Sequence, residues 1–295
     1  MSGIAAKLRT FAELGRVSNL PTTISNVLTG AALGTVGLPW TGADLLRVGG
    51  TWIAIACFYI AGMAMNDVVD AKVDAVERPN RPIPSGRVPR PHAAAFTIVL
   101  LVVGLLIFAM MNLIALVCAV VLVALIAIYN LIHQSTAASV IPLGCARGMV
   151  YVVAAVSLQP RVDWAHLSVF AGALAAYTAL FSLVARSETQ KQLDRRRWVA
   201  VFLPFIAAAP LVLSVSLSRL LPLLPLAIML AWLSRGIGAV FASPPRTREA
   251  VMAWISGICL IDAVYLAQHD RPALMAAAGA CFILTLVIQR RIAGT

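Results

Sequence analysis

Long apolar stretches recur along this chain of 295 residues and limit what it can fold into. We count about ten that are long enough to cross a hydrocarbon layer of about 30 Å as a helix. They are rich in Ala and Leu and show no polar–apolar alternation, which disfavours membrane strands. They lie near residues 20–38, 51–69, 93–111, 113–132, 138–158, 165–185, 198–216, 219–239, 249–268 and 272–289. The sequence therefore predicts an all-α, polytopic membrane bundle.

The charge distribution gives this bundle an orientation. Only 12% of the residues are charged, against about a quarter in ordinary soluble domains. The net charge of +11 would suggest nucleic acid in a soluble protein, but in a membrane protein basic residues mark the cytoplasmic side. Ten spans place both ends inside, whereas nine would place Arg290 and Arg291 outside. We expect an integral inner or plasma membrane protein with a cytoplasmic N-terminus, the lipid bilayer as its surroundings and no nucleic-acid partner.

The polar segments are too short for a separate soluble domain. The longest cover residues 70–92, 186–197 and 242–248, and all three fall on the predicted cytoplasmic side. We therefore expect one transmembrane domain over 1–295 with its chemistry on that side. No cleavable signal peptide is visible, and the five cysteines lie in apolar segments, where they are typical of small core residues.

A group of carboxylates ends the second apolar segment. Asn66, Asp70 and Asp74 are spaced four residues apart, and Asp67 precedes Asp74 by seven, so a helix places all four on roughly one face. Carboxylates this close repel one another, and a bound Mg²⁺, which prefers oxygen ligands and substrate phosphates, would relieve the repulsion. A solvated acidic helix end is the simpler alternative, but it leaves the regular spacing unexplained.

The loop that follows, Glu77–Arg87, is rich in proline and arginine. Prolines lower the entropy cost of holding the loop in one shape, and arginine forks suit diphosphate oxygens. Arg78 and Arg81 are therefore candidate diphosphate ligands. Arginines are also expected on the cytoplasmic side of any membrane protein, so phosphate binding and simple topology marking both remain open.

Residues 66–87 resemble the UbiA superfamily of intramembrane prenyltransferases. The resemblance rests on Asn-Asp-x-x-Asp-x-x-x-Asp followed by Arg-Pro-Asn-Arg-Pro-Ile-Pro-Ser-Gly. It implies a bundle of nine to ten helices around a central cavity that is open to lipid. It also implies an isoprenyl diphosphate donor bound through Mg²⁺, with Asn66, Asp67, Asp70 and Asp74 as metal-site residues.

The second Asp-rich motif of that superfamily is degenerate here. At the expected place the chain reads Arg186-Ser187-Glu188-Thr189-Gln190-Lys191-Gln192-Leu193-Asp194. Glu188 can replace one carboxylate, both as a metal ligand and as a catalytic group, while Gln192 stands where the second belongs. Arg186 and Lys191 are candidates to neutralise diphosphate charge instead. The alternative is that these groups only end a helix on the basic side of the membrane.

The fourth-to-fifth segment connection also departs from the superfamily. Tyr129 matches a tyrosine of the superfamily, but His133 stands near the place of its lysine. Arg147 and Tyr151 follow inside the next span, and a buried arginine is expected to face a polar cavity unless it reaches toward the membrane surface. We assign Arg147 to diphosphate binding and His133 and Tyr151 to the substrate pocket. The combination resembles a divergent, EboC-like branch of the superfamily.

Two polar residues stand out inside other spans. Asn26 is a candidate pocket residue or a partner in a helix–helix hydrogen bond. Asp262 is the one carboxylate deep in the later spans, suited either to pairing with a cation or to a structural role.

The resemblance implies Mg²⁺-dependent transfer of a prenyl group from an isoprenyl diphosphate to a small acceptor that is often aromatic. Asp67, Asp70, Glu188 and Tyr129 are the catalytic candidates. Three alternatives remain open: a terpene cyclase, a phosphoribosyl transferase acting on a lipid phosphate, and a non-catalytic protein that binds or moves prenylated lipids.

Overall fold

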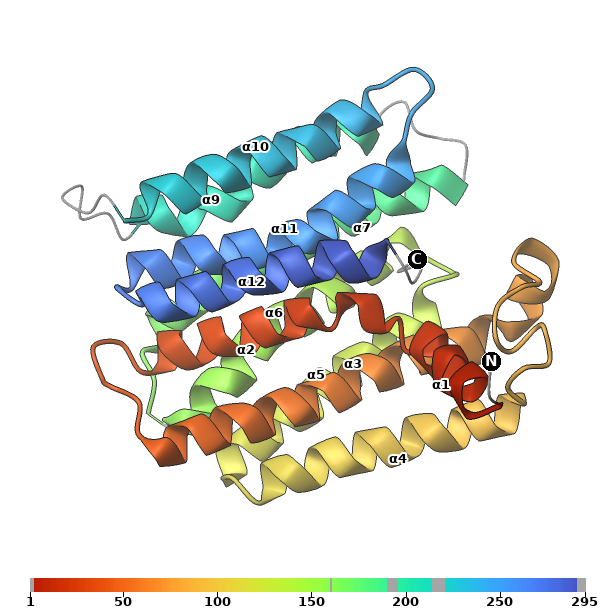
Figure 1. Ribbon diagram of the computed structural model, residues 1–295, viewed down its shortest axis with the longest axis horizontal. Coiled ribbons are helices and arrows are strands. Elements are labelled where there is room, and N and C mark those ends of the chain that lie inside the picture. Colours follow the sequence, from red (N-terminus) through yellow and green to blue (C-terminus); the bar gives the residue numbers. More distant parts are fainter. Residues whose placement is uncertain (1–2, 160, 190–195, 214–220, 291–295) are drawn as a thin grey trace.

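The computed structural model describes residues 3–159, 161–189, 196–213 and 221–290, and every regular element in these ranges is a helix (Figure 1). Eight of the described helices are long and apolar enough to span a membrane. They are α3 (Gly42–Glu77), α4 (Arg90–Ala109), α5 (Leu113–Ile132), α6 (Val140–Leu158), α7 (Trp164–Thr189), α10 (Leu223–Val240), α11 (Thr247–Gln268) and α12 (Pro272–Gln289). The prediction of an all-α membrane bundle is confirmed.

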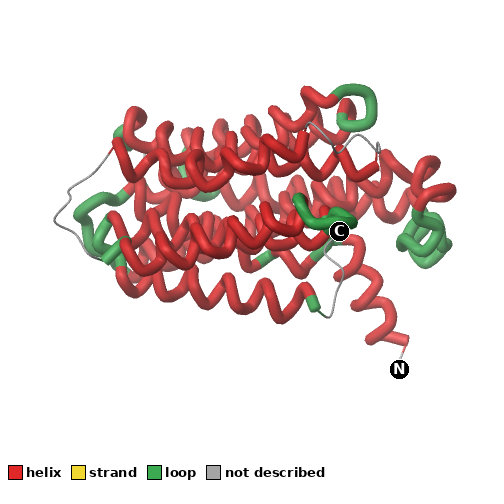
Figure 2. The backbone as a smooth tube through the Cα atoms, turned by 90° about the horizontal axis from the view of Figure 1, so that it is seen from above, coloured by secondary structure: helices red, strands yellow, loops and turns green. Residues whose placement is uncertain are grey.

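Shorter helices complete the bundle. The apolar α2 (Pro21–Gly34) and α9 (Leu203–Leu213) lie among the eight long helices and correspond to the remaining two predicted segments (Figure 1). The other described elements are α1 (Gly3–Leu14) and the 3₁₀ turns η1 (Val17–Asn19), η2 (Ala137–Ser139) and η3 (Arg197–Phe202). Seen from above, the helices run along a common direction and the loops gather at the two ends (Figure 2).

Burial separates inner from outer helices. Most residues of α11 are buried, including its run from Ser256 to Ala267. In contrast, α4 and α5 present large apolar side chains outward, such as Ile98, Leu106 and Leu113. A surface of this kind is stable against lipid tails and unfavourable against water, so the exposed side chains support a membrane location.

Glycines allow several helices to approach closely. A Cβ on Gly144 or Gly148 of α6 would lie 2.3 Å from the carbonyl oxygens of Ala175 and Ala171 on α7. Small residues at such spacing let membrane helices pack backbone against backbone. This contact fixes α7 against α6 and thereby sets where the end of α7 lies.

One end of the bundle collects the predicted chemistry. The end of α3, the beginning of α4, the end of α7 and the connection between α10 and α11 lie at the same end, together with α1 (Figure 1). The alternation of antiparallel spans explains this, because each even-numbered apolar segment of the sequence ends on the same side. That this end faces the cytoplasm stays a prediction.

Candidate functional site

The site is built at the end of α3, a helix of 36 residues that carries its last turns beyond the apolar segment. Asp67 and Asp74 are buried, and both accept hydrogen bonds from the same guanidinium nitrogen, Nη1 of Arg81, at 3.2 Å and 2.6 Å. Arg81 lies in the Pro-rich loop, whose turn is closed by backbone hydrogen bonds from Arg81 to Arg78 and from Ser85 to Arg81. The loop therefore folds back to place a cation between two carboxylates.

Asn66 and Asp67 have a second cationic partner in Arg16. Nη2 of Arg16 lies 3.2 Å from Oδ1 of Asn66 and 3.6 Å from Oδ1 of Asp67. Arg16 precedes η1 and has a left-handed backbone with φ 43°, which is uncommon for a residue other than glycine. Arg16 is not among the site residues predicted from the sequence, although it stands at the polar entry to the first apolar segment.

Asp70 points to the α5–α6 connection rather than to Arg81. Its Oδ1 lies 2.9 Å from Nε2 of His133, and Gln134 donates a hydrogen bond to the same oxygen. Nε2 of His133 is also 3.3 Å from Nδ2 of Asn66. The hydrogen bond with Asp70 raises the pKa of His133, because the carboxylate stabilises the protonated imidazole. His133, assigned to the substrate pocket from sequence, thus lies against the carboxylate group.

The end of α7 completes this side of the site. Nη1 of Arg186 donates hydrogen bonds to the carbonyl of His133 and, at 3.0 Å, to Oγ of Ser139. Glu188 belongs to the last turn of α7, but its side chain lies outside the described residues, as does the whole of Lys191. The structure therefore places Arg186 beside the site and leaves the proposed second metal half-site a prediction.

Two other candidates lie at different distances from this group. The ring of Tyr129 is 5.4 Å from the ring of His133, which places the tyrosine next to the site. Arg78 is exposed at the end of α3 and has no ion pair among the described residues. A role for Arg78 in diphosphate binding therefore requires it to turn toward the ligand.

A deeper polar cluster lies inside the bundle. Asp262 is fully buried and accepts hydrogen bonds from Nδ2 of Asn26, at 2.8 Å, and from the hydroxyl of Tyr151. Arg147 donates a 2.6 Å hydrogen bond to Oγ1 of Thr22 on α2, while its buried Nε has no hydrogen-bond partner among the described residues. Buried polar groups inside a membrane bundle mark pathways or substrate cavities more often than packing.

The donor set at the end of α3 fits a magnesium ion. Carboxylate and amide oxygens are its preferred ligands, and the guanidinium of Arg81 shows that Asp67 and Asp74 can hold one cation between them. In the described part of the chain, however, three acidic or histidine side chains do not converge on one metal-sized position. The arrangement suits an ion held by one or two carboxylates with substrate phosphates and water, which is the usual habit of Mg²⁺.

Comparison with known proteins identifies local relatives. A synthase from Ignicoccus hospitalis is 37% identical over 100 residues, which cover 34% of this chain and 31% of that protein. A synthase from Methanopyrus kandleri is 39% identical over 97 residues, which cover 33% of this chain and 34% of that protein. Both are named digeranylgeranylglyceryl phosphate synthase. The matching segment spans about a third of the length of these curated relatives.

Solved structures share the fold over nearly the whole chain. A structure of digeranylgeranylglyceryl phosphate synthase has a TM-score of 0.61 and 18% identity, covering 90% of this chain and 99% of that one. A UbiA homolog from Archaeoglobus fulgidus bound to GPP and Mg²⁺ has a TM-score of 0.59 and 13% identity, with the same coverage. At such identities the likeness concerns the fold alone.

The family assignment follows from a match over most of the chain. Residues 23–258 match the UbiA prenyltransferase family. This range contains the Asp-rich end of α3 and the Pro-rich loop. It also contains Arg186, which contacts the α5–α6 connection, and Arg147, which contacts α2. The EboC-like branch stays a prediction, because the relatives found carry another name. The chain belongs to the UbiA prenyltransferase family.

Proposed function

We propose that this protein is a Mg²⁺-dependent intramembrane prenyltransferase that uses an isoprenyl diphosphate as donor. One observation carries the proposal. Each of the three carboxylates at the C-terminal end of α3 contacts a cationic or amide side chain, and Asp67 and Asp74 share Arg81. A group of acids that already accommodates a cation between its members is suited to exchange it for a metal–diphosphate unit. Family membership supports the same chemistry.

The residues around the carboxylates have distinct parts in this mechanism. Bound Mg²⁺ would supply Lewis-acid neutralisation of the departing diphosphate. Arg81 and Arg16 bind and orient the diphosphate oxygens, because both guanidinium groups already lie at Asp67. Arg186 adds a fixed positive charge on the opposite side, beside His133. Preorganised charges of this kind stabilise the negative charge that develops as the allylic C–O bond breaks.

The apolar bundle and its aromatic groups serve the prenyl group. The prenyl tail binds between the helices, and the ring of Tyr129 lies where its face can stabilise an allylic cation. The Pro-rich loop after α3 covers the site and excludes water, which would otherwise capture the cation. The nucleophilic acceptor forms the new bond to the allylic carbon, diphosphate leaves and the acceptor loses one proton.

The acceptor class is the finer part of the proposal. The names of the curated relatives point to a glyceryl phosphate lipid carrying a free hydroxyl, which we propose as the first acceptor to test. A small aromatic acceptor, expected from sequence, is the second. The buried polar cluster around Asp262 offers hydrogen-bonding groups to the polar end of either acceptor.

The test is a measurement of released pyrophosphate. Purified protein in nanodiscs is incubated with Mg²⁺, isoprenyl diphosphates of several lengths and each acceptor class. We expect release with a prenylated product, and a loss of about 100-fold or more in Asp70→Asn. Glu77→Gln is the matched control, since Glu77 is an exposed acid on the same helix end, and it should retain activity.

The remaining outcomes separate the rival functions. Release without any acceptor, with a cyclic hydrocarbon product, would indicate a terpene cyclase. Turnover with 5-phosphoribosyl diphosphate and a lipid phosphate would indicate a phosphoribosyl transferase. Measurable binding of isoprenyl diphosphates without release under every condition would overturn the proposal in favour of a lipid-binding protein.

A further inference from the structure

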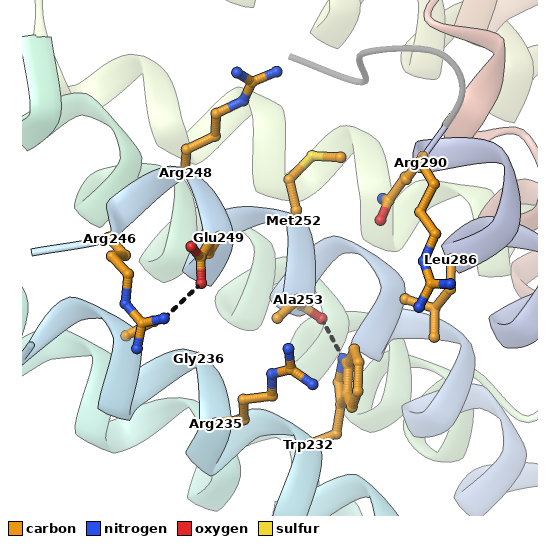
Figure 3. A pocket seen from close by; sticks show the side chains of 12 residues that line it. Trp232, Arg235, Gly236, Arg246, Arg248, Glu249, Met252, Ala253, Leu286 and Arg290 are labelled. Atoms are coloured by element: carbon orange, nitrogen blue, oxygen red, sulfur yellow. Dashed lines mark hydrogen bonds and ion pairs between the residues drawn. The ribbon is translucent and has the colours of Figure 1, made fainter.

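A pocket lined by four arginines lies away from the Asp-rich site, between α10, α11 and α12 (Figure 3). Its volume is about 430 Å³. The side chains that define it, called here the arginine pocket, are Trp232, Arg235, Arg246, Arg248, Met252 and Arg290. None of the residues that hold the carboxylates of α3 lines it, so the pocket is separate from the proposed diphosphate site.

Positive charge in the arginine pocket exceeds negative charge. Four arginines line it, with Glu249 as the one carboxylate, which pairs with Arg246 at 3.1 Å. Within the described ranges, Arg235, Arg248 and Arg290 make no ion pair. Uncompensated guanidinium groups around one cavity are complementary to an anion with several oxygens, above all a phosphate.

One wall of the pocket is apolar and fixed. Nε1 of Trp232 donates a 2.8 Å hydrogen bond to the carbonyl of Ala253, which sets the orientation of the indole. The guanidinium carbon of Arg235 lies 5.1 Å from the centre of that ring, so the charge lies against the indole. Figure 3 shows Arg235 beside Trp232, with Met252 and Leu286 along the neighbouring helices. A cationic rim with an apolar wall suits an amphiphile better than a free ion.

The location of the arginine pocket fits a lipid headgroup. It is formed by the end of α10, the beginning of α11 and the end of α12, which lie at the same end of the bundle as the end of α3 (Figure 1). Since these helices are long enough to span the hydrocarbon layer, their ends are expected at the level of the phosphate groups of the bilayer. A volume of about 430 Å³ is near the lower end of the usual range for ligand pockets, about 300–1,000 Å³, enough for a headgroup and the first part of its chains.

We propose that the arginine pocket binds the phosphate headgroup of an anionic membrane phospholipid. Basic pockets between membrane helices on the cytoplasmic side recognise such headgroups through the same charges. The phosphate is held by the arginines that have no ion pair among the described residues, Arg235, Arg248 and Arg290, and the glycerol and upper acyl chain lie along Trp232 and Met252. This proposal does not depend on the proposed transferase activity.

Native mass spectrometry of the full chain in neutral detergent tests the proposal. The probes are dioctanoyl phosphatidylglycerol, dioctanoyl phosphatidylcholine and inorganic phosphate, each titrated separately. We expect phosphatidylglycerol to bind more tightly than either other probe, and Arg235→Gln/Arg290→Gln to weaken that binding about tenfold or more. Arg47→Gln/Arg161→Gln removes the same charge from two exposed arginines at the other end of the bundle, one near the beginning of α3 and one in the α6–α7 connection, and should leave binding unchanged.

Each alternative result overturns the proposal. Equal binding of phosphatidylcholine would remove the need for an anionic headgroup. Phosphate binding as tight as that of the lipid would indicate a site for a soluble anion. Unchanged lipid binding in the double variant would place the lipid elsewhere. If the double variant does not fold, Arg290→Gln carries the same test, because Arg290 is exposed at the end of α12 and its loss leaves the packing intact.

Discussion

The ends of α3 and α7 occupy equivalent places in the bundle but carry opposite chemistry. At the end of α3, carboxylates of Asp67, Asp70 and Asp74 accept hydrogen bonds from surrounding cationic and amide groups. At the end of α7, Arg186 donates hydrogen bonds to oxygens of the α5–α6 connection. One end is built to receive a cation, whereas the other supplies one from the protein itself.

This difference indicates how the end of α7, where the second Asp-rich motif is degenerate, can still contribute to the site at the end of α3. Arg186 contacts the carbonyl of His133, whose ring contacts Asp70, so the two ends meet through a single residue. Under the proposed function, a guanidinium at this place would neutralise diphosphate charge without any metal ligand. We therefore expect the chain to depend on its α3 carboxylates for metal binding and on α7 for fixed charge.

The largest expected effect comes from removing the cation between the α3 carboxylates. Arg81→Ala leaves Asp67 and Asp74 facing each other, both nearly buried, and breaking a buried charge pair costs about 3–5 kcal/mol. Without Mg²⁺, thermal unfolding should occur at clearly lower temperature than in the wild type. Added Mg²⁺ should recover much of the loss, because it takes the place of the guanidinium. Activity should fall by about 100-fold or more, since the proposed contact of Arg81 with diphosphate would also be lost.

Arg87→Ala is the control for this experiment. Arg87 belongs to the same loop, but its side chain is 40% exposed and pairs with Glu13 at the surface. Surface pairs contribute about 0–1 kcal/mol, so its loss should leave stability and activity nearly unchanged. Equal effects of the two substitutions would show that the loop, and not the cation between the carboxylates, is what matters.

A smaller effect should follow from moving α7 away from α6. Gly148→Ala places a Cβ 2.3 Å from the carbonyl oxygen of Ala171, so α7 must shift, at a cost of about 1–3 kcal/mol. Gly172→Ala is the control on α7, where nothing lies within 4 Å of the added Cβ. Unfolding of both variants in detergent measures the difference. Identical stability would mean that the α6–α7 contact does not set the place of α7.

Next in size is the loss of the α7 charge itself. Arg186→Gln should weaken binding of an isoprenyl diphosphate about tenfold, as expected for one charge-assisted hydrogen bond. The requirement for Mg²⁺ should stay as it is. Arg186→Lys keeps the charge and should recover part of the affinity. A changed Mg²⁺ requirement in Arg186→Gln would contradict the division between the two helix ends.

The sequence predicts the fold and the α3 end well because both rest on local patterns. Apolar length reveals the spans, and the four-residue spacing of Asn66, Asp70 and Asp74 reveals a common face. The sequence does not show that Asp70 contacts His133 while Asp74 contacts Arg81. His133 is 63 residues from Asp70, so their approach depends on tertiary packing. Arg81 is only seven residues from Asp74, but it reaches the carboxylate through the turn of the Pro-rich loop, whose path the residue spacing does not give.

Arg16 and Asp262 show the same limit. Both are visible in the sequence as polar residues near or within apolar segments. However, the partner of Arg16 is Asn66, 50 residues away, and the partner of Asp262 is Asn26, 236 residues away. A single sequence gives no pairing across such separations. The arginine pocket is also invisible from sequence, because arginines near helix ends are expected on the cytoplasmic side whether or not they surround a cavity.

The smallest expected effect concerns pH and the residue where the two ends meet. The pKa of His133 is raised above its ordinary value of about 6.5, because Asp70 accepts a hydrogen bond from the protonated ring. A raised pKa in the folded state means that the contact contributes its full stability below the ordinary pKa and loses it as pH rises through the raised value. In the metal-free protein, kept with a chelator, the wild type should therefore unfold at a higher temperature than His133→Gln near pH 6. The difference corresponds to roughly 1 kcal/mol of stability, and it should close toward pH 9. The control is His92→Gln, at an exposed position in the first turn of α4, which should show no such closing gap. A gap that persists unchanged to pH 9 would mean that His133 joins the two helix ends through neutral hydrogen bonds alone, and that the charge at this junction comes from Arg186.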